Sequence, residues 1–334
     1  MMRCSRVWLS NASALLATFG PFDIVQSAAH SGVVEVQMNS RNNKLNLLDD
    51  SFVRNLPLAM AFLNEDLNST ARVAILVGGD DRPFSAGLDI KSAMKTFFKD
   101  VSSVDKAKVA VSTALGVSTK IRDGGEGMPA MRNQEMHRVI REFQDSISSV
   151  ARCRVPVIAA INSHCLGGAI SLATACDFRF CTSDSKFCVK EVKIGINPDI
   201  GTLQRLYPLV GQGRARELTF SARNFSAADA KSYGLVEEVF ADKESMLTAA
   251  RASAVEIASN SPLAVQGAKH VMNVPSERAV QESLDYVRLW NSAFIKSNDL
   301  VSFGTAFATK SEPQFTDFVV DSTSPPIAPT KRQV

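Results

Sequence analysis

The chain has 334 residues, of which 45% are hydrophobic and 21% are charged, proportions that are ordinary for a globular protein with a sizeable core. Its formal net charge of +3 is too small over this length to indicate a partner such as nucleic acid. Six cysteines occur without a CxxC pair, which argues against a zinc site or a disulfide framework and favours buried thiols in a reducing compartment.

The first segment, residues 1–28, resembles a mitochondrial presequence. It carries Arg3 and Arg6, several serines and alanines, and no acid before Asp23, a composition typical of such presequences. The alternative is a leader without a targeting function. Its apolar run is too short and interrupted to span a bilayer, so we expect no membrane span. We expect a mitochondrial location, with a peroxisomal or glycosomal one as the alternative.

Strand-like and helical patterns then alternate along the chain. Residues 32–39 alternate apolar and polar side chains, whereas 71–79 and 155–162 are nearly continuous apolar runs, as in strands buried on both faces. Residues 49–68 and 134–152 place apolar side chains at helical spacing between those strands. This order of elements predicts an α/β fold with crossover helices.

The predicted core spans residues 29–236 and is interrupted by residues 91–133, where periodicity is weak and a DGGEGMP loop occurs. We interpret this interruption as an insertion or lid. From 237 to 310 helical patterns dominate, which predicts a helical C-terminal subdomain. Residues 311–334 carry several prolines and serines, which indicates a tail that is loose at its end.

The stretch RPFSAGLDIKS (82–92) directly follows one predicted buried strand. Its small residues Ser85, Ala86 and Gly87 let a ligand approach the backbone, and glycine permits unusual backbone dihedrals. By itself the stretch is equally consistent with a simple turn.

The stretch INSHCLGGAISLATACDFRF (161–180) follows the next predicted buried strand. Gly167 and Gly168 open a predicted buried helix, whose first N–H groups and positive dipole end can bind an anion or a developing oxyanion. Close packing of the helix on the sheet is the alternative explanation for the glycines. Neither GxGxxG nor a P-loop is present. His164 lacks a GxSxG partner motif, so we expect a structural role for it.

The stretch KFCVKEVKIGINPDIGTLQRL (186–206) contains two acids, Glu191 and Asp199, among apolar residues and glycines. Surface acids that serve solubility are one interpretation. The other is a pair of buried carboxyl groups, since apolar surroundings keep a carboxylate basic enough to transfer protons.

Taken in this order, the three stretches resemble the enoyl-CoA hydratase/isomerase (crotonase) superfamily, and the resemblance extends from about Ser31 to Thr309. It implies a spiral of ββα units with a C-terminal helical region that assembles homotrimers or homohexamers. It also implies an acyl-CoA thioester as substrate, with no separate cofactor and no metal. The thioester carbonyl would be bound by the N–H groups of Ala86 and Gly168, where charge collects when a proton α to the carbonyl is removed.

Within the superfamily, hydratases carry a second glutamate at the position of Ser171, so water addition is disfavoured here. The dienoyl-CoA isomerase branch is more similar, because it carries acids matching Glu191 and Asp199. This resemblance implies conversion of a 3,5-dienoyl-CoA to a 2,4-dienoyl-CoA in β-oxidation of unsaturated fatty acids, with Asp199 as the base at C2 and Glu191 as the acid at C6. That branch usually has a third acid at position 171, which is Ser171 here.

Two alternatives remain at this stage. The chain could be a diverged hydratase or δ3-δ2-enoyl-CoA isomerase, or it could be a non-catalytic member that only binds acyl-CoA. In each case the residues expected around the substrate are Gly87, Leu88, Asp89, Ile90, Lys91 and Ser171.

Overall fold

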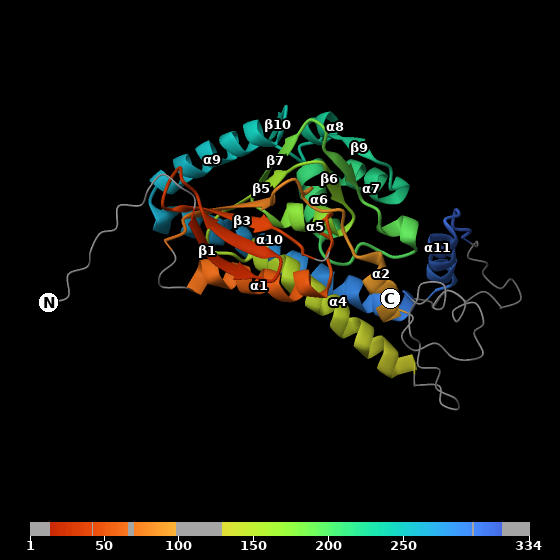
Figure 1. Cartoon of the computed structure of the whole chain (residues 1–334). Helices are drawn as coiled ribbons and strands as arrows, with labels where there is room; N and C mark the ends of the chain where they lie inside the picture. Colours follow the sequence, from red (N-terminus) through yellow and green to blue (C-terminus); the bar gives the residue numbers. More distant parts are fainter. Residues whose placement is uncertain (1–13, 42, 66–69, 98–128, 296, 316–334) are drawn as a thin grey trace, which may run out of the picture.

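A sheet covered by helices on both faces forms the centre of the fold (Figure 1). The computed structural model describes residues 14–41, 43–65, 70–97, 129–295 and 297–315. The strands in these ranges are β1 (Ala14–Phe19), β2 (Phe22–Gln26), β3 (Val33–Met38), β4 (Val73–Gly78), β5 (Val157–Ile161), β6 (His164–Leu166), β7 (Phe178–Thr182), β8 (Lys186–Cys188), β9 (Phe225–Ser226) and β10 (Glu238–Phe240). The helices are α1 (Asp50–Glu65), α2 (Ile90–Phe97), α4 (Pro129–Ala151), α5 (Gly168–Ala175), the 3-10 helix η1 (Glu191–Ile194), α6 (Thr202–Val210), α7 (Gln212–Ser221), α8 (Ala227–Ser232), α9 (Lys243–Ser259), α10 (Pro262–Phe294) and α11 (Asn298–Thr309).

Within the described residues the main sheet has seven strands in the order β1-β2-β3-β4-β5-β7-β10. The strands from β3 to β10 are parallel to their neighbours, whereas β1, β2 and β3 pair in antiparallel fashion. A smaller sheet combines β6, β8 and β9. The parallel strands and the helices between them confirm the predicted α/β class.

The parallel strands bury side chains on both faces, as their continuous apolar runs predict. On one face Leu76 and Ala159 belong to a core shared with residues of α1, α4 and α5. On the other face Ile75 and Ile158 belong to a core shared with the small residues along α9. Burial on both faces fixes the register of the central strands and therefore the position of the loops that follow them.

The predicted boundary of a leader at residue 28 is wrong. Residues 14–19 and 22–26 form β1 and β2, and Phe22 and Ile24 have no exposed surface. These strands pair with β3, so this part of the chain belongs to the core. Composition alone misses them because these short strands, like a presequence, are mostly apolar and carry a single acid, Asp23. Residues 1–13 lie outside the described residues.

The predicted boundary at residue 237 also needs correction. Residues 238–240 form β10, which pairs with β7 at the edge of the main sheet, and α9 covers one face of that sheet. A three-residue strand carries too little periodicity to be recognised in the sequence. Most of the predicted insertion at 91–133 lies outside the described residues, and its described ends belong to α2 and α4.

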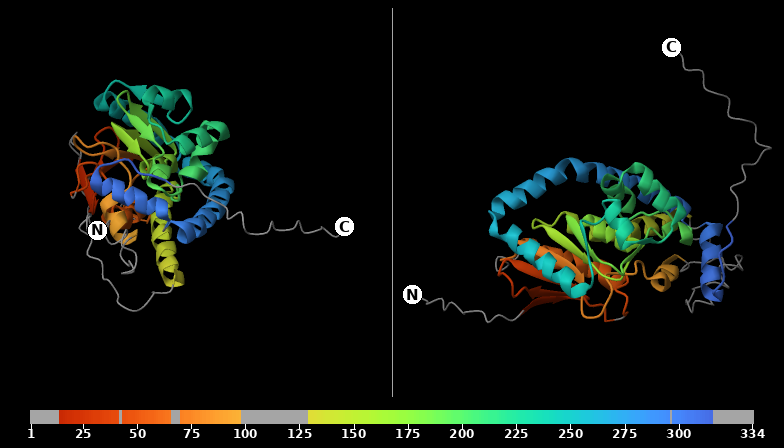
Figure 2. Two further views of the ribbon diagram at one scale, coloured as in Figure 1. Left: turned by 90° about the vertical axis from the view of Figure 1, so that its right-hand side faces the viewer. Right: turned by 90° about the horizontal axis from the view of Figure 1, so that it is seen from above.

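The long helix α10 curves along one side of the molecule (Figure 2, right). Near its start Lys269, which is 4% exposed, donates hydrogen bonds to the Val155 carbonyl at 3.0 Å and to the Asp177 carboxylate at 2.7 Å. Asp177 also accepts the Val157 N–H. This ion pair between the buried Lys269 and the partly exposed Asp177 ties α10 to the beginning of β5.

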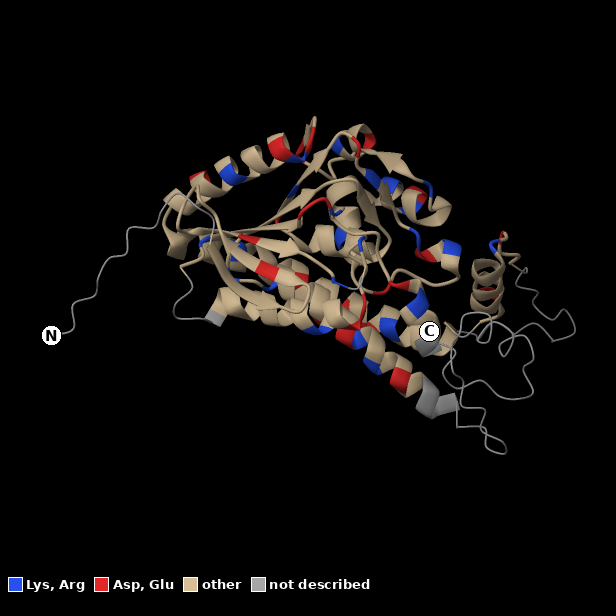
Figure 3. Ribbon diagram, viewed as in Figure 1, with Lys and Arg blue, Asp and Glu red and all other residues tan. Residues whose placement is uncertain are grey.

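Basic and acidic residues are interspersed along α4 and α9 (Figure 3). In the described part of the chain, no helix is both long and apolar enough to cross a membrane. Five cysteines are free and buried there, as predicted, and Cys4 lies outside that part.

We predict that Lys269→Met lowers the free energy of unfolding by roughly 3 kcal/mol, because it leaves a partly buried carboxylate without its cation. Urea titration followed by circular dichroism measures the loss. Arg278→Ala is the matched control on α10: the Arg278–Glu282 side chains are 85% and 72% exposed, and such surface pairs contribute at most about 1 kcal/mol. Equal losses in the two variants would contradict the anchoring role of Lys269.

Candidate active site

A cavity of about 370 Å³ opens where the segments after β3, β4 and β5 meet, beyond the carboxyl ends of these parallel strands. Ligand sites in parallel α/β sheets commonly lie at this edge. Its walls come from four parts of the chain: the loop before α1, the loop and first turn of α2, the start of α5, and the segment from Lys190 to Ile200. Helices α4 and α11 add apolar side chains.

The loop after β4 is fixed against two neighbouring segments. The Ser85 hydroxyl donates to the Asn46 carbonyl at 2.7 Å and accepts the Gly87 N–H at 3.1 Å. Gly87 has φ +88°, and a Cβ there would lie 2.3 Å from the Leu166 carbonyl oxygen and 3.4 Å from the Gly168 nitrogen. Only glycine therefore fits at this position, and the loop touches the start of α5.

The prediction that the Ala86 N–H binds the thioester oxygen is wrong. Its N–H donates to the Leu45 carbonyl at 3.0 Å, so the group is already occupied, although Ala86 lines the cavity. Leu88 and Gly168 also line the cavity. Among the interactions of the described residues, neither of their N–H groups donates to a protein acceptor. Gly168 is the first residue of α5, where helical N–H groups have no partner within the helix.

Glu191 opens the 3-10 helix η1, which ends at Gly195 with φ +76°. The Gly167 N–H donates to the Cys188 carbonyl at 2.8 Å and so brings this segment to the start of α5. A Cβ on Gly167 would lie 3.9 Å from Glu191 Oε1. The Glu191 side chain is 7% exposed, and neither carboxyl oxygen has a hydrogen-bond partner within the described chain. Burial, with a smaller contribution from Asp199, raises the pKa of Glu191 to about 7.

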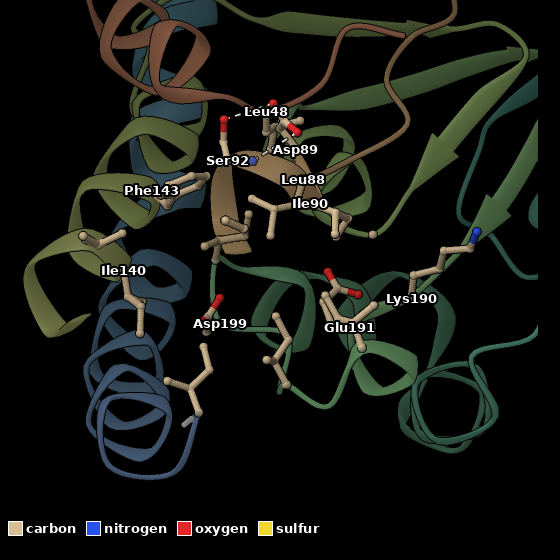
Figure 4. Close-up of a pocket in the computed structure, with 18 of the residues that line it drawn as sticks. Leu48, Leu88, Asp89, Ile90, Ser92, Ile140, Phe143, Lys190, Glu191 and Asp199 are labelled. Carbon is tan, nitrogen blue, oxygen red and sulfur yellow. Dashed lines mark hydrogen bonds between the residues drawn. The ribbon is translucent and has the colours of Figure 1, made fainter. Parts of the chain in front are cut away.

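Asp199 is held from two helices. The Asn291 amide of α10 donates to Asp199 Oδ2 at 2.6 Å, and the Gln144 amide of α4 donates to the Asp199 carbonyl at 2.7 Å. Burial raises the pKa of Asp199 to about 6, and the hydrogen bond from Asn291 counteracts part of that rise. Figure 4 shows the carboxyl groups of Asp199 and Glu191 both turned into the cavity, below Leu88 and Ile90.

The other predicted substrate-binding residues divide into two groups. Leu88, Asp89 and Ile90 line the cavity, but the Asp89 carboxylate accepts the Lys91 N–H at 3.0 Å and so caps α2. Gly87 and Lys91 do not belong to the lining, and Lys91 is exposed.

Ser171 also lies outside the cavity lining. It has no exposed surface, and its hydroxyl is 2.6 Å from that of Thr202. The expectation that Ser171 lies beside the substrate is therefore wrong. His164 does not line the cavity either, and its Nδ1 pairs with the Ser163 hydroxyl at 2.6 Å.

Sequence patterns did not identify the residues that α4, α10 and α11 contribute. Phe143 and Ile140 on α4 and Phe303 on α11 form apolar walls, and Asn291 reaches Asp199 from α10. The helical spacing of these side chains is equally typical of core packing, so no local signal distinguishes them. Within the described residues, no group of three or more His, Cys, Asp or Glu side chains is placed to hold a metal ion.

Comparison with known proteins gives consistent results. The family model described as enoyl-CoA hydratase/isomerase matches residues 121–318. The peroxisomal Delta(3,5)-Delta(2,4)-dienoyl-CoA isomerase of Arabidopsis thaliana is 33% identical over 300 residues, covering 90% of this chain and 98% of the plant protein. The mitochondrial Delta(3,5)-Delta(2,4)-dienoyl-CoA isomerase of Mus musculus is 36% identical over 276 residues, covering 82% of this chain and 76% of the mouse protein.

Solved structures agree with the fold. The crystal structure of an enoyl-CoA hydratase from Bacillus anthracis matches with a TM-score of 0.60 and 27% identity, covering 88% of this chain and 98% of that protein. The predicted crotonase-like architecture is therefore confirmed.

We predict that Glu191→Gln reduces the pH dependence of stability. A carboxyl group whose pKa is raised by folding has no net effect on stability while both states are protonated; it destabilises the native state progressively as pH rises from about 4.5 to about 7, and the full cost is present above about 7. The rise from 4.5 to about 7 corresponds to roughly 3 kcal/mol at full ionisation.

Thermal unfolding at pH 5.5 and pH 8.5 measures this effect. The melting temperature of Glu191→Gln, relative to the parent protein, should be higher at pH 8.5 than at pH 5.5. Asp184→Asn, at a carboxylate outside the cavity lining, is the control. An equal offset at both pH values would show that Glu191 is not a buried ionisable group.

Proposed function

Because the chain belongs to the enoyl-CoA hydratase/isomerase family, we propose that it is a dienoyl-CoA isomerase that converts 3,5-dienoyl-CoA thioesters to 2,4-dienoyl-CoA thioesters in the β-oxidation of unsaturated fatty acids. The observation that carries this proposal is a pair of acids, the buried Glu191 and the partly exposed Asp199, which line one cavity together with two backbone N–H groups that have no acceptor among the described residues. The named activity of the plant and mouse relatives supports it.

The reaction moves one proton from the substrate and returns one, with no oxidant and no cofactor. Asp199 takes the proton from C2, and the electron pair of that C–H bond spreads through the diene to the thioester oxygen. The N–H groups of Leu88 and Gly168 stabilise the charge on that oxygen. Each such donor contributes on the order of 3–4 kcal/mol in comparable sites. Glu191 then donates its proton to C6, and the conjugated 2,4-diene forms.

The protonation states required by this sequence follow from the environments of the two acids. The pKa of Asp199 is about 6 and that of Glu191 is about 7, so in the interval between them Asp199 is ionised while Glu191 keeps its proton. Burial raises both pKa values, and the ordinary pKa of a glutamate already lies above that of an aspartate; the hydrogen bond from Asn291 counteracts part of the rise at Asp199. After each turnover the two acids exchange protons with solvent to restore this state.

The apolar part of the cavity accommodates the hydrocarbon chain. Phe143 and Ile140 project from α4 towards Ile90 (Figure 4), and Phe303 lines the cavity from α11. Lys190 lies across the cavity from α4, and its ammonium group points away from the cavity (Figure 4).

Water addition is less compatible with this site. The position where hydratases carry a second glutamate holds Ser171, whose hydroxyl pairs with Thr202 outside the cavity lining. Hydration of crotonyl-CoA by the purified protein would support a diverged hydratase. Acyl-CoA binding without turnover of any dienoyl-CoA or 3-enoyl-CoA substrate would support a non-catalytic member.

The proposal also covers the oligomeric state and the location of the protein. The single chain exposes large apolar side chains along α10, including Val271, Met272, Tyr286 and Leu289, each more than 60% exposed, and exposed apolar surface is a feature of protein interfaces. A homotrimer or homohexamer would cover them. A mitochondrial or peroxisomal location is supported by the printed names of the mouse and plant relatives.

We predict that light scattering after gel filtration gives a mass of three or six chains. Tyr286→Glu with Leu289→Glu should lower that mass, because two charges would be buried in the interface. A parent protein that is monomeric at micromolar concentration would exclude this assembly.

We predict that Asp199→Asn and Glu191→Gln each lower kcat on a 3,5-dienoyl-CoA by at least about 1,000-fold, since each removes one of the two proton-transfer groups. The absorbance of the conjugated product measures the rate. Ser171→Ala is the control and should retain kcat within about threefold, because Ser171 lies outside the cavity lining. Near-parent rates in either acid variant would rule out the assigned roles.

A further inference from the structure

The side chain of Asn291 makes the direct polar contact to the Asp199 carboxylate. Asn291 lies on α10 and is 2% exposed. Its amide nitrogen donates to Asp199 Oδ2 at 2.6 Å and to the Asn197 carbonyl at 3.0 Å. An amide nitrogen has two hydrogens, so both are committed to the segment that carries Asp199. Oδ1 of Asp199 is left to meet the substrate.

One helical turn earlier, Arg288 fixes the position of α10 itself. Its guanidinium donates to Gln144 Oε1 at 3.0 Å, to His137 Nε2 at 2.9 Å and to Asp285 Oδ1 at 2.8 Å. Gln144 in turn donates to the Asp199 carbonyl. The backbone and the carboxylate of Asp199 are therefore held by one connected network that joins α4 and α10.

We propose that Asn291 is a positioning residue for the proton-abstracting carboxylate: it orients Asp199 with one oxygen towards the cavity and stabilises the ionised form without neutralising its charge. The inference rests on the proposed function, in which Asp199 removes the C2 proton. A neutral donor suits this task. A lysine or arginine in its place would form an ion pair and make the carboxylate a weaker base.

The charged side chains that line the cavity with Asp199 are those of Asp49, Asp50, Asp89, Lys190, Glu191 and Lys193. Arg288, Asp285 and His137 belong to the network that joins α4 and α10, and these helices and α11 carry further charged residues, including Arg141, Asp145 and Asp299. None of them forms an ion pair with Asp199 within the described chain. Arg288 is committed to Gln144, His137 and Asp285. The hydrogen bond from Asn291 is therefore the interaction that offsets part of the burial of this carboxylate.

Loss of this bond should raise the pKa of Asp199 towards that of Glu191. The interval in which the base is ionised and the acid is protonated would then narrow or close. Loss of the bond should slow proton transfer. Substrate binding should change little, because Asn291 does not line the cavity.

The test compares Asn291→Leu, which keeps the number of side-chain heavy atoms and removes both donors, with the smaller Asn291→Ala. In both variants we expect kcat on a 3,5-dienoyl-CoA to fall about 10- to 100-fold, the loss of a hydrogen bond to a charged group, with KM within about threefold. The acidic limb of the pH–kcat profile should move to higher pH. Ser292→Ala is the matched control: this neighbouring buried hydroxyl donates only to the Arg288 carbonyl, and its profile should stay that of the parent.

A loss of kcat that is equal at every pH, with an unmoved acidic limb, would overturn the proposal, because a merely structural role predicts that result. So would parent-like kinetics in both Asn291 variants. Binding of saturated octanoyl-CoA confirms that each variant is folded.

If the parent protein does not convert dienoyl-CoA, the proposed function fails, but the role of Asn291 is still measured. Carbon-13 labelling of aspartate carboxyl groups gives an Asp199 signal, assigned by its absence in Asp199→Asn. Its titration midpoint should move to higher pH in Asn291→Leu. An unchanged midpoint would contradict the inference independently of activity.

Discussion

Two carboxyl groups, of the buried Glu191 and the partly exposed Asp199, share one cavity, and among the described residues neither pairs with a cation; the rest of the site is arranged around this constraint. In the described part of the chain, Glu191 has no hydrogen-bond partner for its carboxyl oxygens and Asp199 has one side-chain donor, Asn291. Burying an ionised group in this way costs free energy. The cost is offset elsewhere, chiefly by a sheet whose central strands are buried on both faces. The same burial gives these acids pKa values close to neutrality.

The parallel sheet explains how a polar reaction centre forms inside an apolar cavity. Its strands end at one edge, so the loop after β4 and the start of α5 meet there, and the glycine at position 87 lets the two backbones touch. Backbone N–H groups at a helix start need no charged side chain to stabilise an anion. The thioester oxygen can thus be stabilised without a cation that would lower the pKa of the neighbouring acids. This arrangement keeps both carboxyl groups competent for proton transfer.

The serine at position 171 illustrates how a local replacement is absorbed by the fold. Its hydroxyl pairs with Thr202 between α5 and α6, where it has no exposed surface, and it supplies no charge to the cavity. The raised pKa of Glu191 comes chiefly from burial, with Asp199 as the smaller contribution. The proposed mechanism therefore assigns proton transfer to two acids, and the pKa of each depends on its own surroundings: burial at Glu191, and burial together with the amide of Asn291 at Asp199.

The sequence by itself determined the α/β class, the central strands and the pair of acids, because those features are encoded locally. Strands β4 and β5 are continuous apolar runs, and Glu191 and Asp199 lie within the short stretch 186–206. It misplaced the boundaries near residues 28 and 237, since the short strands β1, β2 and β10 gain their stability from pairing with neighbours. Only the tertiary structure decided which N–H groups are free, that Ser171 faces Thr202, and that Asn291, ninety-two positions beyond Asp199, donates to it. Hydrogen-bond partners and burial are set by which segments meet in space, and no local pattern records that.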